Sequence, residues 1–363
     1  MQIGGIQKSL LNLLNCINKD YDVTLLLFSN YGTLFKDIPK NIKVIFADKR
    51  IQVLGTPWSD IKKNPFLVYY KLCSKMICMV KGKEAALSFL FKHQKLITGY
   101  DAIISYPHCT PEKVLSICTP EFVLNCTKSK NKICFIHCDY IHSDTFSEHN
   151  NLIYKRFNKI ACCSESVRMN FLQMIPELKD KTFTVRNFYD QSIIEQANEK
   201  PYVYDNSYIN LLSVARLSEE KGILRAIVAI SKSHRQDIRY YIIGNGPQVN
   251  EIKEYINDHA LSERVFLLGE KKNPYRYMLN ADYLIVPSYH EAAPMVFDEA
   301  NILKLKVISS ETTSAKEMLT SYDMIFDFDH DNVFDIIRIS KTEKEFSPDL
   351  SIVRQAFDNI IRS

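Results

Sequence analysis

Short apolar runs alternate with amphipathic segments along almost the whole chain. The runs are unbroken and rich in Ile, Val and Leu, which is typical of strands buried on both faces of a parallel sheet. In the first half they predict strands at 22–28, 42–46, 101–105, 131–136, 158–162 and 182–186. In the second half they predict strands at 209–215, 238–243, 264–268, 282–286, 305–309 and 323–327. Strands that alternate with helices indicate an α/β fold with parallel sheets covered on both faces.

Helical periodicity between the strands predicts helices at 6–18, 65–80, 83–98, 149–156 and 165–174. A chain of 363 residues is long for a single core, so two domains are expected. The polar stretch 189–208 has no sustained periodicity and separates the two series of strands. We therefore expect a Rossmann-like domain at 1–188 and a second at 189–345. An amphipathic helix within 346–363 is expected to pack back onto the first domain.

Composition and cysteine usage favour a cytoplasmic protein. No apolar run reaches the 18 residues of a membrane-spanning helix, and the first residues lack the basic start of a secretory signal. Ten cysteines stand at irregular spacing in a chain that is large enough to fold without disulfides, which favours reduced thiols. Cys134-x3-Cys138, with His137 and His142 nearby, raises the possibility of zinc, but no second pair follows at zinc-finger spacing. Buried free thiols are the preferred interpretation.

The formal net charge is +4, and it is unevenly distributed. Residues 49–100 hold ten Lys and Arg against two acids, Asp60 and Glu84, interleaved with aromatic residues. Such a mixture suits peripheral contact with an anionic membrane at its inner face. The alternative is a solvated helical face over a core. The lysines expected at such a surface are Lys71, Lys75, Lys81 and Lys83. No nucleic-acid partner is expected.

Two loops in the second half carry candidate chemistry, because ligands of open α/β sheets bind beyond the carboxyl ends of the strands. The first loop, in LLSVARLSEEKG, holds Arg216 and Lys221, followed by Gly222. Two cations five residues apart can grip a diphosphate and neutralise the charge that develops on it. The alternative is that both form surface ion pairs with Glu219 and Glu220. On charge alone, the surface ion pairs would be the preferred interpretation.

The second loop lies in VPSYHEAAPMVFDEA. Pro294 suits the opening of a helix, which leaves Glu291 in the loop and Glu299 within the helix. A helix N-terminus beyond a strand attracts phosphate, and a carboxylate on the same helix can bind ribose hydroxyls. For an isolated pair of glutamates, solvated charges would be the preferred interpretation.

Together these segments resemble a known family. SVARLSEEKG, IIGNGP, FLLGEKKNPY and YHEAAPMVFDEA, in this order, resemble the donor domain of family 4 glycosyltransferases. In the first half, Gly4-Gly5-Ile6-Gln7-Lys8 is similar to the family's glycine-rich loop, CFIHCDY to its strand ending in His, and VRNF to its turn before the second domain. The resemblance implies the GT-B fold, with two Rossmann-like parallel-sheet domains facing a central cleft.

The resemblance also implies a function. A retaining, metal-independent glycosyltransferase would move a hexosyl or N-acetylhexosaminyl group from a nucleotide-sugar, by expectation a UDP-sugar. The acceptor would be a glycan or a lipid-linked saccharide in cell-surface polysaccharide synthesis. No cofactor is implied, because the nucleotide-sugar is a co-substrate. Asp327-x-Asp329 lies past the donor motifs, and we assign it no metal.

Residue roles follow from the same resemblance. Arg216 and Lys221 would bind the donor diphosphate, Glu299 the ribose and Glu291 the transferred sugar. Gly5 would approach the donor phosphate, and His137 would contact the donor sugar. The implied catalytic set is Glu291, His137, Arg216 and Lys221. The implied donor-binding set is Gly5, Arg216, Lys221, Gly244, Glu270, Lys271, Lys272, Glu291, Ala292, Ala293, Pro294, Met295, Val296 and Glu299. A lone His at the end of an apolar strand is more often structural than catalytic. The position of His137 at the carboxyl end of its strand, with Asp139 and Tyr140 following, makes the two roles about equally well supported.

The chain departs from the family at three places. Ala292 and Ala293 stand where the family often has Gly, which stiffens the loop and leaves the donor sugar open. Gln7 stands where an acidic residue is common. Only Met1-Gln2-Ile3 precedes the glycine loop, which is too short for a strand of about five residues. We therefore expect that a first strand is missing from the sequence, through a start codon assigned too late or through trimming.

Three rival functions were weighed. An oxidoreductase would need a dinucleotide fingerprint, and the candidate at 244–249 has Val249 at the third glycine position. A nucleotide-sugar epimerase of GT-B architecture would interconvert sugars without an acceptor. A catalytically silent nucleotide-sugar-binding protein is disfavoured by the presence of Arg216, Lys221, Glu291 and Glu299.

Overall fold

The computed structural model of the chain describes residues 4–30, 32–330, 333–338, 344–346 and 349–362. These residues form two compact units. The first comprises residues 1–188 together with 350–363, and the second comprises residues 189–349. The last helix of the sequence is therefore part of the first unit.

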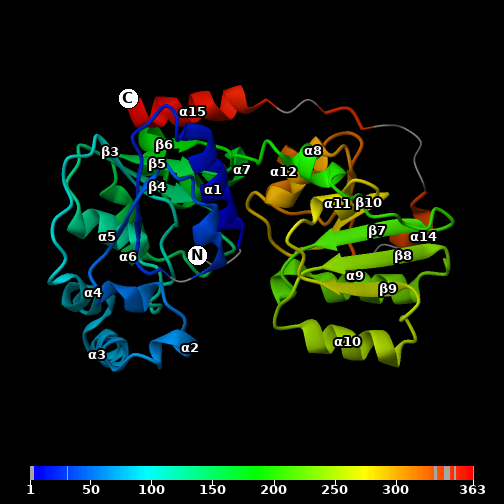
Figure 1. The fold of residues 1–363 in the computed structure, drawn as a ribbon, viewed down its shortest axis with the longest axis horizontal. Coiled ribbons are helices and arrows are strands. Elements are labelled where there is room, and N and C mark those ends of the chain that lie inside the picture. The colour runs from blue at the N-terminus through cyan, green and yellow to red at the C-terminus, as the bar shows by residue number, and fades with distance from the viewer. Residues whose placement is uncertain (1–3, 31, 331–332, 339–343, 347–348, 363) are drawn as a thin grey trace. The chain divides into compact units, whose positions relative to one another are not determined.

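The second unit is built on one parallel sheet with the strand order β12-β11-β10-β7-β8-β9 (Figure 1). Its strands are β7 (Ile209–Val214), β8 (Ile238–Ile243), β9 (Val265–Gly269), β10 (Tyr283–Val286), β11 (Lys306–Ser309) and β12 (Met324–Ile325). Its helices are α8 (Ile193–Asn198), α9 (Ile223–Lys232), α10 (Val249–Asp258), α11 (Tyr275–Met278), α12 (Met295–Ile302), α13 (Ala315–Met318) and α14 (Val333–Ile336). All four residues of β10, Tyr-Leu-Ile-Val, are buried, which explains why this strand is an unbroken apolar run in the sequence.

Successive residues of these strands point to opposite faces, so the sheet has a core on each side. Leu211, Tyr240 and Ile285 pack with α9, α10 and α14 on one face. Leu212 and Leu284 pack with α8, α11, α12 and α13 on the other. Figure 1 shows α9 and α10 together beside β8 and β9.

The first unit contains two separate parallel sheets, β1-β2 and β3-β4-β5-β6. Its strands are β1 (Thr24–Leu27), β2 (Lys43–Phe46), β3 (Ala102–Ser105), β4 (Asn131–Ile136), β5 (Lys159–Cys162) and β6 (Thr182–Thr184). Its helices are α1 (Gly5–Ile17), α2 (Trp58–Ile61), α3 (Pro65–Lys81), α4 (Lys83–Phe91), α5 (Thr119–Cys126), α6 (Glu148–Lys155), α7 (Glu165–Met174) and α15 (Leu350–Arg362).

Local sequence signals explain where these helices start and stop. The Asn64 side chain accepts hydrogen bonds from Phe66 N and Leu67 N, and Pro65 opens α3. Gly82, at a φ of +84°, ends α3 before α4 begins. The Ser164 hydroxyl accepts from Val167 N and caps α7. Asn, Ser and Pro commonly begin helices, and Gly commonly ends them, so the helix boundaries follow from local sequence.

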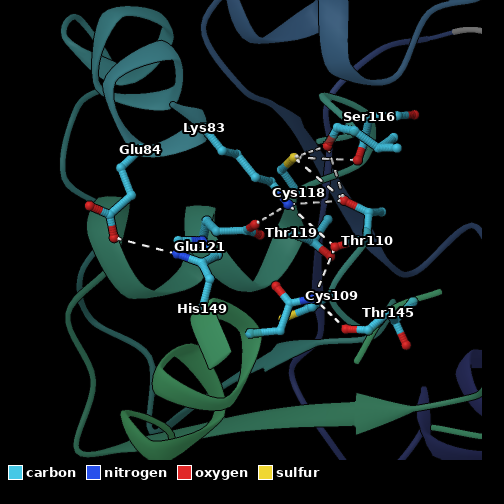
Figure 2. A network of polar contacts seen from close by, with 12 residues as sticks. Lys83, Glu84, Cys109, Thr110, Ser116, Cys118, Thr119, Glu121, Thr145 and His149 are labelled. Atoms are coloured by element: carbon cyan, nitrogen blue, oxygen red, sulfur yellow. Dashed lines mark hydrogen bonds and ion pairs between the residues drawn. The ribbon is translucent and has the colours of Figure 1, made fainter. Parts of the chain in front are cut away.

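A buried polar network joins α4 to α5 and to the loop before it (Figure 2). Lys83 Nζ lies 2.8 Å from Glu121 Oε1, and both side chains are almost fully buried. Lys83 Nζ also donates to Thr110 Oγ1 at 3.2 Å. The expectation that Lys83 is a surface lysine is therefore wrong. A lysine in a basic stretch looks exposed in sequence, but here a carboxylate from a distant helix compensates its burial.

The expected α/β class is confirmed, with parallel sheets and helices in both units. Each expected strand is found, with ends that differ by a few residues. The helix expected at 83–98 ends at Phe91, and α5 and α8 were not expected. The α8 helix lies inside the stretch 189–208. This stretch is polar and the helix is short, so no helical periodicity was recognised there. The expectation of a missing first strand concerns residues 1–3, which lie outside the described residues.

Candidate functional site

The strand order of the second unit locates a ligand crevice. From β7 the sheet grows through β8 and β9 on one side and through β10, β11 and β12 on the other. β7 and β10 are therefore the neighbouring strands at which the order reverses, and Leu212 pairs with Leu284 there. Loops that leave such strands in opposite directions open a crevice at their carboxyl ends. Both candidate loops of the sequence begin at this point.

The loop after β7 carries Arg216 and Lys221. Arg216 is exposed, whereas Lys221 lies at the end of a short 3-10 turn. Glu220 accepts a hydrogen bond from the Ser218 hydroxyl at 2.6 Å. Among the described residues neither cation forms an ion pair with Glu219 or Glu220, so the ion-pair alternative weighed for this loop is wrong.

Lys221 instead reaches the second candidate loop. Its Nζ lies 2.8 Å from Glu291 Oε1, although the two residues are 70 positions apart in sequence. Glu291 is 9% exposed, and the Ser288 hydroxyl donates to the same Oε1 at 2.7 Å. The Ser314 hydroxyl donates to the Glu291 carbonyl at 3.2 Å. The Glu291 carboxylate is thus held by a cation and a hydroxyl in the loops that follow β7 and β10.

Backbone contacts fix the two loops against each other. Tyr289 N donates to Glu220 O at 3.0 Å. Gly222 has a φ of +62°, and a Cβ at this position would come within 2.0 Å of Pro287 O. Only glycine adopts this conformation at little cost and allows so close an approach. The position of Lys221 beside Glu291 therefore depends on Gly222.

The helix α12 follows the second loop. Pro294 is its N-cap and Met295 its first residue, which agrees with the expected helix opening. Ala292, Ala293 and Val296 are half-buried. Glu299 is 3% exposed, and Tyr275 Oη donates to its Oε1 at 3.4 Å. The buried carboxylate is thereby tied to α11, which follows the loop after β9.

The glycine of the IIGNGP segment has a packing role in this structure. Gly244 has a φ of +151°, and a Cβ there would lie 1.8 Å from Ala215 O. A Cβ at Gly246 would lie 2.2 Å from Leu217 O. Both glycines let the loop after β8 lie against the loop that carries Arg216. Gly244 thus packs against the backbone of the loop that carries Arg216 and Lys221. This packing does not depend on any contact between Gly244 and a donor.

The segment 270–272, expected at the nucleobase, follows β9. Glu270 and Lys272 are exposed, and Lys271 is half-buried. Within the described part of the chain, no hydrogen bond or ion pair holds these three side chains. They are available to a ligand, and their role stays a prediction.

The first unit holds the other two candidates. Gly5 opens α1, is exposed, and has no atom within 4 Å of the position of a Cβ. Packing within its unit therefore does not require a glycine there. Ser9, one turn further, contacts Tyr106 Oη at 2.6 Å and donates to Asn187 Oδ1 at 2.7 Å. These contacts anchor the first turn of α1.

His137 lies at the end of β4, with its ring centroid 4.7 Å from that of Tyr106. Burial and, to a smaller extent, the neighbouring His108 lower the pKa of His137 to about 3, although a hydrogen bond to the Tyr106 backbone opposes the shift. The imidazole is therefore neutral at physiological pH. Its Nε2 is buried and has no hydrogen-bond partner among the described residues. A neutral, unpaired ring nitrogen is suited to accept from a ligand hydroxyl.

The residues considered as metal ligands from the sequence are either ion-paired or buried in the structure. Asp329 pairs with Arg225 at 3.2 Å, and Asp327 with His330 at 2.8 Å. Cys134 is fully buried, and burial raises its pKa well above the ordinary value. Within the described residues no group of three or more His, Cys, Asp or Glu has the arrangement of a metal site.

Comparison with known proteins identifies the second unit. Residues 195–343 match the sequence family described as glycosyl transferases group 1. The chain carries a group 1 glycosyltransferase domain. The enzymatic class expected from the sequence is thereby confirmed.

Two relatives and one solved structure illustrate the extent of the likeness. The chain is 29% identical over 152 residues to an uncharacterized glycosyltransferase of Methanocaldococcus jannaschii, which covers 39% of this chain and 37% of that protein. It is 22% identical to an N-acetylgalactosaminyltransferase of Campylobacter jejuni named for a diphospho-undecaprenol substrate, over 98% of this chain and 93% of the relative. Staphylococcus aureus TarM, solved with UDP, matches with a TM-score of 0.68 at 13% identity, over 100% of this chain and 98% of that one. This last likeness shows the fold alone.

The site of the glycosyltransferase domain also uses residues that sequence reasoning missed. Ser288, Ser314 and Tyr275 each hold one of the two glutamates. Ser288 could have been found, because it stands two residues after β10, at the carboxyl end of the strand. Ser314 and Tyr275 carried no such signal, since they reach the site from other elements.

Proposed function

We propose that this chain transfers a sugar from a nucleotide-sugar donor, by expectation a UDP-sugar, to a saccharide acceptor. We further propose that it does so with retention of configuration and without a metal ion. The observation that carries the proposal is the contact between Lys221 and Glu291 at the reversal point of the sheet. This contact puts a cation for phosphate and a carboxylate for hydroxyl groups side by side. UDP in the TarM structure supports the choice of donor base.

In the proposed site the donor diphosphate lies against Arg216, Lys221 and the N-terminus of α12. The helix dipole and the two cations then offset the charge of the leaving group. Lys221 shifts its interaction from Glu291 towards the diphosphate, and Glu291 becomes free to accept from sugar hydroxyls. Glu299 binds the ribose, and residues 270–272 frame the base.

The reaction breaks the bond between the anomeric carbon and the diphosphate oxygen. An acceptor hydroxyl forms the new bond on the same face of the sugar, and its proton passes to the leaving diphosphate. Nucleoside diphosphate and a glycoside are the products. His137 and Gly5 are proposed to contact the donor sugar and the donor phosphate.

We propose a lipid-linked saccharide or a growing polysaccharide as the acceptor. The name of the Campylobacter relative, which includes a diphospho-undecaprenol, supports an acceptor of this class. The described helices include none that is both long and apolar enough to cross a membrane. We also propose that a peripheral contact brings the chain to such an acceptor at the inner face of a membrane.

A panel of nucleotide-sugars tests the proposal, with binding followed by calorimetry and donor turnover by release of nucleoside diphosphate. Arg216→Ala and Lys221→Ala should each lower turnover by roughly two to three powers of ten, the loss of one preorganised charge. Lys232→Ala, on the exposed part of α9, is the matched control. Turnover that survives both substitutions but is abolished by EDTA would contradict the metal-free mechanism. Interconversion of the sugar without an acceptor would indicate an epimerase instead.

A further inference from the structure

The helix α3 presents an exposed apolar face. Of its 17 residues only Leu67 and Ser74 are buried. Leu72 is 54% exposed, Met76 63%, Met79 79% and Val80 75%. Side chains of this kind are normally covered in a folded protein, and a contiguous exposed set marks an interaction surface.

The exposed side chains share one side of the helix. Positions 66, 69, 72, 76, 79 and 80 follow the three- and four-residue spacing of a single helical face. Leu67 lies on the opposite side and packs into the core with α4 and α5. The helix is therefore apolar on both sides, and the core accounts for only one of them. We call the exposed set, Phe66, Tyr69, Leu72, Met76, Met79 and Val80, the α3 face.

Exposed cations border the α3 face. Lys75 and Lys81 lie on the helix, and Lys62 and Lys63 precede it. The nearby acid, Asp60, is paired with Lys63 at 2.7 Å. A rim of lysines around an apolar stripe is complementary to lipid tails below anionic headgroups.

The structure corrects which lysines belong to this rim. Lys71 turns inward, where its Nζ donates to Val53 O at 3.0 Å and to Leu115 O at 3.3 Å, and burial lowers its pKa. Lys83 is buried against Glu121. The expectation that these two lysines contact lipid is therefore wrong, and Lys75 and Lys81 remain.

We propose that α3 lies flat on an anionic bilayer, with the α3 face among the upper acyl chains and Lys75 and Lys81 at the headgroups. A helix of 17 residues extends about 25 Å along such a surface, so the whole face can insert in parallel. The inference rests on the proposed function in so far as a lipid-linked acceptor explains why the enzyme needs a membrane. It concerns only the first unit and is measured without turnover.

Trp58 makes the test direct. It is the only tryptophan of the chain, is 53% exposed, and stands at the start of α2, seven residues before α3. The full chain is mixed with vesicles of phosphatidylcholine, alone or with phosphatidylglycerol. Co-sedimentation measures binding, and the emission of Trp58 with brominated lipids measures insertion. We expect binding to the phosphatidylglycerol vesicles, weakening steeply with salt, and quenching of Trp58.

Two sets of variants separate the apolar and the charged contributions. Leu72→Gln/Met76→Gln/Met79→Gln should lower binding by at least tenfold and remove the quenching. Lys75→Gln/Lys81→Gln should lower binding by roughly tenfold to thirtyfold, at about fivefold per lysine. The matched controls are Leu152→Gln/Met169→Gln, equally exposed apolar residues of the same unit, and Lys128→Gln/Lys130→Gln. Both controls should bind as the wild type does.

Three results would overturn the inference. These are absence of wild-type binding to the acidic vesicles, equal binding to neutral and acidic vesicles, and unchanged binding of the Leu72/Met76/Met79 variant. A wild-type dimer that these substitutions dissociate, without vesicle binding, would assign the α3 face to a second copy of the chain. Nucleotide-sugar binding by the same proteins reports separately on the proposed function, so either idea can fail alone.

Discussion

Lys221 and Glu291 compensate each other in the described structure, and each is also assigned to a different part of the donor. The carboxylate is 9% exposed, so its charge would be costly without the lysine and the Ser288 hydroxyl. A diphosphate competes with the carboxylate for the lysine. Binding of the donor is therefore expected to exchange one ion pair for another, which leaves Glu291 facing the sugar.

This exchange predicts opposite results for the two glutamates. Glu291→Ala should leave binding of free nucleoside diphosphate intact, or tighten it a few-fold because a competing carboxylate is removed, while binding of the whole nucleotide-sugar weakens. Glu299→Ala should weaken both ligands, since ribose is present in both. Calorimetric titration with each ligand gives the comparison. Equal losses of both ligands in both variants would show that the assigned roles are wrong.

The neutral state of His137 predicts a dependence of stability on pH. Its folded pKa is about 3, because burial and then His108 lower it, whereas an unfolded histidine titrates near 6.5. Between these values only the unfolded chain binds the proton. The stabilisation is therefore complete above about pH 6.5 and is lost as the pH falls towards 3.

His137→Gln removes this titration. The free energy of unfolding of the wild type, relative to this variant, should fall by up to about 1.4 kcal/mol per pH unit below pH 6.5. Urea unfolding at several pH values between 7.5 and 5 measures it. Parallel curves for the two proteins would mean that folding leaves the pKa of His137 near the unfolded value.

At the scale of elements, the proposed donor site depends on how two loops and one helix meet. The loop after β7 lies on the loop after β10 through Gly222, and the loop after β8 supports it through Gly244 and Gly246. Each of these glycines allows backbone to approach backbone. Substitutions of these glycines should therefore displace Arg216 and Lys221, although neither of these two residues is itself changed.

Gly222→Ala tests this dependence. The left-handed conformation costs an alanine about 1–2 kcal/mol, and the added Cβ would also press on Pro287 O and displace the Glu291 loop. We expect a loss of donor turnover of at least tenfold. Gly269→Ala is the matched control, since Gly269 has a φ of +69° but no atom within 4 Å of a Cβ. Similar turnover in the two variants would show that the close approach does not matter.

At the scale of the whole molecule, the chain passes from the first unit to the second and returns. The α15 helix places Val353, Phe357 and Ile360 into the core around β4 and α1. Arg354 Nη1 donates to Cys16 O, and Arg354 Nη2 pairs with Asp20, both at 2.8 Å. The stability of the first unit thus depends on the last residues of the sequence.

Phe357→Ala should destabilise the first unit by about 3–5 kcal/mol, because it opens a cavity beside Tyr21 and Phe188. Binding of nucleoside diphosphate by the second unit should change much less. Ile352→Ala, on the exposed side of α15, is the control. Denaturant unfolding with nucleotide binding followed in parallel measures both effects. An equal loss of both signals would mean that the two units unfold together.

The sequence by itself determined the class of the fold and the positions of its strands along the chain. A buried strand such as β10 is an unbroken apolar run, and this pattern is a local property that can be recognised without any knowledge of contacts. The positions of Arg216, Lys221 and Glu291 in loops after strands, and of Glu299 in the helix that follows, were predicted from the same pattern together with the family resemblance.

Only the tertiary structure decided which charges meet. Lys221 pairs with Glu291 across 70 residues instead of with its neighbours Glu219 and Glu220, because β7 and β10 are adjacent in the sheet. In the basic stretch, Lys83 is buried beside Glu121, whereas the apolar face of α3 stays exposed. Burial depends on which elements pack together, and a hydrophobic pattern that is apolar on two sides of a helix does not state which side the core will cover.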